Sequence, residues 1–264
     1  MRLAVAAGLP FERLVAGPRD LLGPLYESEG YRKLAKQHGP TDLVHGPMLG
    51  DVTDTAAAIW LRTARASRIV ILVRDLANRA IVLEAVGRTI PESDFTAVVR
   101  LTGLKPGQAY GYQVLVDGRP QKAENTRFRT TATVGQPGKT RIVFGGGAGY
   151  VPIWERMWDT IGKRKPDALL MLGDNVYIDA PTETLTTRYC YYRRQSRPEW
   201  RRLVAGTPVY AIYDDHDFGT NDCVPGPEIE QPPWKRRVWN TFTRNWCNPY
   251  YGGGEKQPGC WCDF

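Results

Sequence analysis

The chain has 264 residues, of which 42% are hydrophobic and 24% are charged, and its formal net charge is +7. This length can hold one large domain or two ordinary ones, and the composition excludes a disordered or fibrous chain. No apolar run approaches the roughly 18 residues of a membrane helix, the start shows no clear secretory signal, and the positive charge favours anionic partners without choosing among them.

Residues 1–45 are predicted to form a helical extension. Segments 19–26 and 29–37 show short helical patterning between proline and glycine signals. We expect His38 and His45 to be surface histidines and not metal ligands. This part of the chain is therefore predicted to be an extension and not a domain.

Residues 46–132 predict a β-sandwich. Short runs rich in β-branched residues alternate with turn signals at the spacing typical of a sandwich. After the Leu104-Lys-Pro-Gly107 turn, Tyr110, Tyr112 and Val114 alternate as in a fibronectin type III or immunoglobulin-like module with a corner tyrosine. Residues 133–140 are predicted to be a linker. The expected strands are 57–62, 68–74, 81–86 and 95–101.

Residues 141–264 alternate between predicted strands and helices. The order strand, helix, strand, helix, strand implies right-handed crossovers and a largely parallel sheet. The turns at 145–149, 174–177 and 214–221 then lie at one edge, where open α/β sheets bind ligands. The expected elements are strand 141–145, helix 152–163, strand 168–172, helix 198–206 and strand 208–213.

Two of these turns are rich in metal-binding side chains. Gly173-Asp174-Asn175 follows one buried strand, and Asp214-Asp-His-Asp217 follows another. Carboxylates packed this closely repel one another unless a positive ion lies among them, and carboxylate, amide oxygen and imidazole suit a hard divalent or trivalent metal. A solvated acidic turn with Asn and Asp caps is the alternative. Because two such turns are present, we favour the metal site over the solvated acidic turn.

The motifs Gly173-Asp-Asn-Val-Tyr177 and Asp214-Asp-His-Asp217, with Asn221 behind them, resemble the PhoD-like branch of the metallophosphatases. That family contains alkaline phosphatases and phosphodiesterases. The resemblance implies a β-sandwich followed by a partial α/β metallophosphatase domain. It also implies two metal ions, Fe³⁺ with Ca²⁺ or other divalent ions, and an extracytoplasmic location. The metal ligands it implies are Asp174, Tyr177, Asp214, Asp215 and Asn221.

The sequence departs from the family pattern in two places. The family's glycine-rich turn usually carries a ligating Cys or acid, whereas residues 145–149 offer no ligating side chain. Family members also continue with further strands and a distal His/Asp motif, so the resemblance covers residues 45–264 and only the front of the catalytic domain. We therefore expect the chain to be truncated at its C-terminus relative to the family, and to show weak or absent activity on its own.

The predicted function is metal-assisted hydrolysis of a small phosphate mono- or diester. Asp215 and His216 are the expected catalytic residues, although His216 could instead ligate a metal. The alternative is a noncatalytic module that binds a surface glycan or protein and holds a structural Ca²⁺. Asn175, Arg193 and Arg194 are the expected contacts to the substrate phosphate.

Segment 188–202 interleaves arginines with aromatic side chains, a pattern that can bind single-stranded nucleic acid. We favour a helix pair with a solvated basic face, so nucleic acid is expected only as a substrate. The five cysteines are odd in number and form no Cys-x-x-Cys pair, which argues against a zinc ribbon. Cys260 and Cys262 are expected to be buried or disulfide-bonded. The oligomeric state stays open.

Overall fold

The computed structural model describes residues 1–9, 11–16, 19–39, 41–224, 226, 228 and 230–263. Positions 10, 17, 18 and 40 of the predicted extension 1–45 lie outside these residues. So does Phe264, the last residue of the predicted part 141–264. Four short helices precede the first strand: α1 (Arg2–Ala6), α2 (Phe11–Ala16), α3 (Arg19–Glu27) and α4 (Glu29–His38).

The last two of these helices correspond to the predicted helical segments. Helix α4 begins after Ser28, whose hydroxyl accepts a hydrogen bond from the Tyr31 backbone N–H and so satisfies one open donor of the first turn. A small apolar cluster of Phe11, Val15 and Leu34 packs these helices against Val44 of the first strand.

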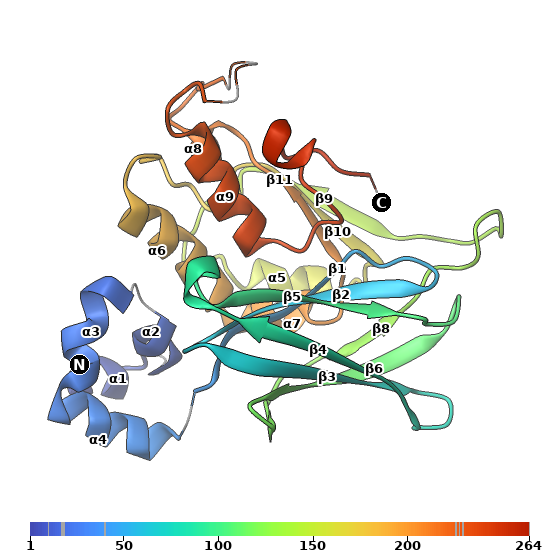
Figure 1. The fold of residues 1–264 in the computed structure, drawn as a ribbon, viewed down its shortest axis with the longest axis horizontal. Coiled ribbons are helices and arrows are strands. Elements are labelled where there is room, and N and C mark those ends of the chain that lie inside the picture. Colours follow the sequence, from blue (N-terminus) through green and yellow to red (C-terminus); the bar gives the residue numbers. More distant parts are fainter. Residues whose placement is uncertain are drawn as a thin grey trace.

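Two antiparallel sheets follow and pack face to face (Figure 1). Their inward-facing apolar side chains form one continuous core, as expected where strand residues alternate between two faces. The predicted β-sandwich is confirmed. One sheet has the order β1 (Leu43–Gly50), β2 (Ala56–Thr63), β5 (Thr96–Thr102). The other has the order β4 (Ile81–Thr89), β3 (Ser67–Asp75), β6 (Ala109–Val116), β7 (Arg119–Pro120), with β8 (Arg127–Arg129) paired to β6.

Strand β1 was not predicted. Gly46 and Pro47 interrupt its apolar pattern, and the pairing with β2 shifts register on both sides of them. Gly46 has a φ of +82°, and a Cβ there would lie 2.9 Å from the Trp60 carbonyl oxygen. Glycine is therefore needed for the close approach of these two strands.

The predicted corner tyrosine is Tyr110. Its hydroxyl accepts a hydrogen bond of 2.8 Å from the backbone N–H of Lys105, five residues upstream, and so holds the turn to its strand. Tyr112 has a different role, since its hydroxyl donates to the carbonyl oxygen of Ala205 at 2.7 Å. This bond links the sandwich to the α/β half of the molecule.

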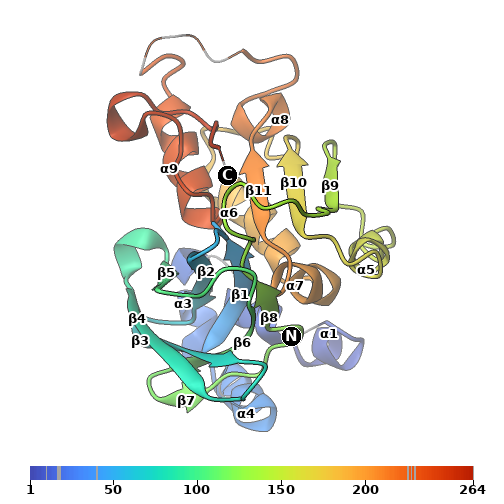
Figure 2. The same ribbon diagram turned by 90° about the vertical axis from the view of Figure 1, so that its right-hand side faces the viewer.

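The α/β half contains a parallel three-stranded sheet in the order β11-β10-β9 (Figure 2). Both strand pairs are parallel, which confirms the predicted parallel arrangement. The predicted helix 152–163 is shorter than expected, because 152–156 form turns. The strands are β9 (Ile142–Gly145), β10 (Ala168–Leu172) and β11 (Val209–Ile212), and the helices are α5 (Met157–Gly162), α6 (Thr184–Gln195), α7 (Pro198–Val204), α8 (Asp215–Phe218) and α9 (Lys235–Asn245).

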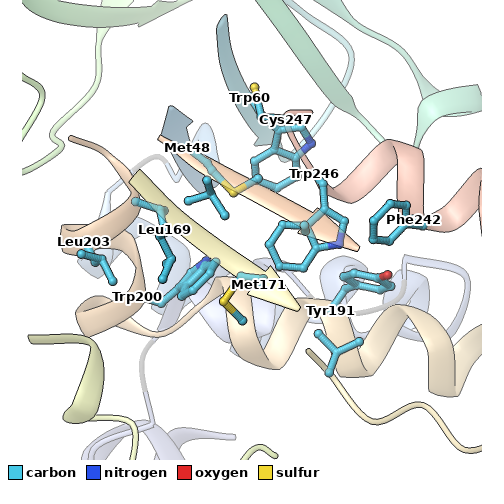
Figure 3. Close-up of a cluster of buried hydrophobic side chains, with 14 of the residues drawn as sticks. Met48, Trp60, Leu169, Met171, Tyr191, Trp200, Leu203, Phe242, Trp246 and Cys247 are labelled. Carbon is cyan, nitrogen blue, oxygen red and sulfur yellow. The ribbon is translucent and has the colours of Figure 1, made fainter. Parts of the chain in front are cut away.

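The β1-β2-β5 sheet is covered on both faces. One face meets the second sheet of the sandwich, and the other packs on the α/β half through a second hydrophobic core (Figure 3). Trp60 of β2 is fully buried in that second core, and its indole N–H donates to the Arg244 carbonyl oxygen at 2.7 Å. Met48 on β1 and Trp246 after α9 belong to the same cluster. The sandwich and the α/β half therefore pack together through this second core.

A buried polar network crosses the same interface, and it corrects the prediction for His45. This residue is 0% exposed. Its Nδ1 lies 2.8 Å from Nη1 of Arg62, which is also 0% exposed. Because a guanidinium only donates, Nδ1 is the acceptor, and Nε2–H donates to Ser196 Oγ at 3.1 Å. Arg62 also donates to Gln195 and Asn245 and forms an ion pair of 3.1 Å with Asp94.

All five cysteines are free, so neither Cys260 nor Cys262 forms a disulfide. Both thiols are partly buried, and burial raises the pKa of each. Within the described residues, no helix is long and apolar enough to cross a membrane.

Candidate metal centre

The turn after β10 depends on glycine. Gly173 has a φ of +100°, and a Cβ on it would lie 2.5 Å from the Cβ of Asp214. The missing side chain therefore allows the end of β10 to approach the start of α8. Asp174, Tyr177 and Asp179 follow with φ of 52°, 52° and 51°. Left-handed backbone at non-glycine residues is strained and is found where the surrounding structure holds it.

Asp217 holds this strained loop. One carboxylate oxygen accepts from the backbone N–H and the side-chain amide of Asn175 at 2.7 and 2.9 Å. The other accepts from the backbone N–H groups of Val176 and Tyr177 at 2.8 and 3.2 Å. Burial raises the pKa of Asp217 to about 6, although the backbone donors favour the charged form. The sequence shows this acid in the motif, but no role was assigned to it.

The metal-binding groups come from two turns at the carboxyl edge of the parallel sheet. Asp174 follows β10, while Asp215 and His216 form the first turn of α8, beyond the end of β11 (Figure 2). One ligand atom from each of these three residues lies within 4.8 Å of the others. Strands remote in sequence thus bring three of the predicted site residues together.

The donor atoms of this cluster fit a hard cation. Oδ1 of Asp174 and Oδ1 of Asn175 are both buried and have no hydrogen-bond partner. A buried oxygen without a partner costs about 1–3 kcal/mol, so an acceptor in this state is suited to a positive ion. Carboxylate and amide oxygens are ligands for Ca²⁺ and Mn²⁺, and an imidazole nitrogen beside them suits a transition metal such as iron.

His216 is oriented by an acid that the sequence analysis did not single out. Its Nδ1 lies 2.5 Å from Oδ1 of Asp179, and this hydrogen bond raises the pKa of the imidazole. The ring also packs on Tyr177, with 4.7 Å between centroids. A carboxylate at Nδ1 fixes the proton there and leaves Nε2 for a metal or a substrate oxygen. The signal in the sequence was an aspartate two residues after Tyr177.

Tyr177 lies between the metal cluster and the glycine-rich turn 145–149. Burial raises the pKa of its hydroxyl, and the nearby Asp174 carboxylate adds to the rise. A Cβ on Gly149 would lie 3.7 Å from the Tyr177 ring. Gly147 donates its N–H to the Gly173 carbonyl oxygen at 3.2 Å. This turn, which offers no ligating side chain, packs against the tyrosine and the β10 turn.

Two of the expected ligands, Asp214 and Asn221, make other hydrogen bonds in this structure. Asp214 is exposed and caps α8, since its carboxylate accepts from the Asp215 N–H at 2.9 Å. It is outside the cluster of Asp174, Asp215 and His216. Asn221 is exposed, and its amide donates to Asp222 at 2.5 Å. A side chain that satisfies a helix N-cap points back along its own backbone, which explains the placement of Asp214.

The expected phosphate contacts are engaged in holding backbone. Arg193 donates to the Val176 carbonyl oxygen at 2.6 Å. Arg194 is 2% exposed, donates to the Ala148 carbonyl oxygen and lies 3.6 Å from the buried Glu155 carboxylate. Burial lowers the pKa of Arg194 to about 10. Asn175 is also buried. The burial of Arg194 corrects its expected role, because it supports the glycine-rich turn from inside.

Comparisons with known proteins agree with this architecture. The family described as Domain of unknown function (DUF7800) matches residues 40–133, the part that forms the sandwich. No curated protein matches the sequence. The solved structure of PhoD is similar to 82% of this chain, with a TM-score of 0.68 and 17% sequence identity, and the match covers 48% of the PhoD chain. The chain therefore has a fold similar to that of PhoD and spans about half of its length.

Two smaller solved structures also match, at TM-scores too low to support an argument. The FN5 domain of Drosophila Lar is 18% identical over 36% of this chain and 96% of its own, with a TM-score of 0.24. The sensor domain of the anti-sigma factor RsgI4 in Pseudobacteroides cellulosolvens is 17% identical over 36% of this chain and 98% of its own, with a TM-score of 0.28.

Proposed function

We propose that residues 141–264 form the front part of a metallophosphatase-like catalytic domain that hydrolyses phosphate esters. The observation that carries this proposal is the buried, unpartnered Oδ1 of Asp174 beside Asp215 and His216. The likeness to the PhoD fold supports the reaction class. Because the chain spans about half of PhoD, the activity of the whole protein is itself part of the proposal.

Asp174, Asp215 and His216 would hold the first cation, and the buried, unpartnered side-chain oxygen of Asn175 on the same turn is a further candidate ligand. A bound cation of this kind lowers the pKa of water and polarises a phosphoryl oxygen. Asp217 keeps the Asp174 turn in place through its four hydrogen bonds. Preorganised ligands of this kind need little rearrangement when substrate binds.

The alternative role proposed for His216, which excludes metal binding through Nε2, is that of a proton carrier. Asp179 holds the proton on Nδ1, which leaves Nε2 to give a proton to a leaving alkoxide or to accept one from an attacking water. Tyr177 restricts the imidazole from one side. An orientation fixed by two neighbours favours transfer at one stated atom.

The proposed substrate is a small phosphorylated molecule, either a monoester or a diester, and nucleic acid enters only as a diester substrate. We propose iron with calcium as the pair of metal ions and an extracytoplasmic location. The +7 net charge supports an anionic substrate by long-range attraction.

Metal binding is the first test. Calorimetric titration of the metal-free protein with Mn²⁺, Ca²⁺ and Fe³⁺ should show binding that Asp174→Asn weakens by about 100-fold, since losing a ligand exceeds the roughly 10–100-fold effect of losing its supporting contacts. Glu84→Gln removes one negative charge from exposed surface on β4 and is the matched control. Equal binding by both variants would refute the assigned site.

Turnover is the second test. The same proteins are assayed with chromogenic phosphate mono- and diesters in the presence of each metal. Any hydrolysis should require the metal and should be lost in Asp174→Asn but kept in Glu84→Gln. Metal binding without turnover in the full gene product, across all metals, would favour a noncatalytic module with a structural Ca²⁺.

A further inference from the structure

A basic cavity lies away from the metal cluster. It has a volume of about 380 Å³ and is formed by α6, α9 and the loop that carries Asp94 at one end of the sandwich. Helices α6 and α9 lie side by side in both views (Figures 1 and 2). Four arginines line the cavity against a single acid. The charged lining residues are Asp94, Arg188, Arg236, Arg237 and Arg244.

The positive charge of this cavity is only partly compensated. Asp94 is paired with Arg62 from the interior at 3.1 Å, and Arg236 is paired with Glu230 and Glu255 at 2.6 and 3.0 Å. Arg237 differs from these. Its Nη2 is buried and has no hydrogen-bond partner, and within the described part of the chain its guanidinium forms no ion pair. Arg244, which is exposed, also forms no ion pair within those residues, so an anion in the cavity meets guanidinium groups whose charge no acid neutralises.

The cavity face of α9 carries a repeating set of donors. Arg237, Asn240, Thr241 and Arg244 follow one another at intervals of three, one and three residues and line the same cavity. Side chains at this spacing occupy one face of a helix. Val238 and Phe242, on the other side of α9, are buried. Two guanidinium groups and two neutral polar side chains are thus presented together.

This cavity is separate from the metal cluster because α6 stands between them. Thr187 and Arg188 of α6 line the cavity. Cys190 and Arg193 of the same helix instead contact the loop of the metal cluster, through the Tyr177 and Val176 carbonyl oxygens. Arg188 and Arg193 are five residues apart, which turns them by about 140° around the helix axis. Ligands at the two places would not overlap.

We propose that this cavity binds a small phosphorylated molecule at a site distinct from the metal centre. Arginine side chains recognise phosphate through paired N–H donors. The volume falls within the roughly 300–1,000 Å³ typical of small-molecule sites, so it accommodates a phosphate with an organic group attached. The inference uses only the cavity and its charges, and it holds whether or not the metal cluster is catalytic.

The test uses the intact protein after treatment with a chelating resin. Inorganic phosphate, glycerol 3-phosphate and glycerol are titrated into it by calorimetry at constant ionic strength. We expect glycerol 3-phosphate to bind at least as well as phosphate and glycerol not to bind. Arg237→Gln and Arg244→Gln should each weaken phosphate binding about tenfold, the loss expected for one charge-assisted hydrogen bond.

Two controls separate this site from charge effects and from the metal centre. Arg74→Gln removes one charge from an exposed position on β3 and should leave the affinity within about twofold. Asp174→Asn should also leave it unchanged. Absence of phosphate binding, equal loss in Arg74→Gln and Arg237→Gln, or loss of binding in Asp174→Asn would overturn the proposal. Arg244 is exposed, so its variant tests the site even if Arg237→Gln perturbs folding.

Discussion

Replacing Asp217 by alanine should destabilise the protein more than the loss of so small a side chain suggests. Its carboxylate accepts four hydrogen bonds from Asn175, Val176 and Tyr177, and it is 1% exposed. Alanine leaves the backbone N–H groups of Asn175, Val176 and Tyr177 without their acceptor, which costs about 1 kcal/mol each at the low end. The expected loss is therefore about 3 kcal/mol.

Urea denaturation of the metal-free protein at pH 8 measures this loss. The matched control is Asp117→Ala, because the exposed Asp117 carboxylate accepts one backbone hydrogen bond from Arg68 and forms one exposed ion pair with Arg65. Its loss should stay below about 1 kcal/mol. If Asp217→Ala is no more destabilising than Asp117→Ala, then Asp217 does not hold the strained loop. The metal affinity of Asp217→Ala should also fall, since Asp174 lies on the same turn.

Three further predictions concern residues that hold the fold together. Gly173→Ala should destabilise the protein by about 1–3 kcal/mol more than Gly103→Ala, because both have positive φ but only the Cβ at 173 meets backbone, and thermal unfolding compares them; equal losses would contradict the close approach to Asp214. Arg62→Met should cost about 3–5 kcal/mol in chemical denaturation, since it leaves buried polar partners unpaired, whereas Arg68→Met at an exposed position should change little. Burial raises the pKa of Cys247 to about 12, so iodoacetamide at pH 8 should leave it unlabelled in the native protein and modify it after unfolding; rapid native labelling would disprove its burial.

The parallel sheet could be predicted because its strands are continuous apolar runs separated by helical segments. Ala168–Leu172 is apolar throughout, which predicts a strand buried in a parallel sheet, and the strand is buried along most of its length. Strand β1 gave no such signal, because Gly46 and Pro47 break the alternation of its side chains. The burial of His45 was also not predictable. It depends on Arg62 and on Ser196, which is 151 residues away along the chain.

The residue types of the candidate site could be predicted from the sequence, but the direction in which each side chain points could not. Asp174, Asp215 and His216 were expected together because parallel strands end at one edge of a sheet. Among the consecutive acids of the second motif, the sequence does not show which one caps α8 and which faces the cluster. Asp214 caps the helix, Asp215 faces the cluster, and Asp217 turns inward to the loop. One helical turn separates these roles, and only the placement of α8 decides them.

We propose that Asp174, Asp215 and His216 bind a metal ion. The most direct measurement is an anomalous difference map from crystals grown with Mn²⁺, an ion that carboxylate and imidazole ligands accept. A peak within about 2.0–2.6 Å of Asp174 Oδ1 and in contact with Asp215 and His216 is the predicted result. A well-ordered site without a peak at saturating Mn²⁺, or a peak held by other residues, would contradict it.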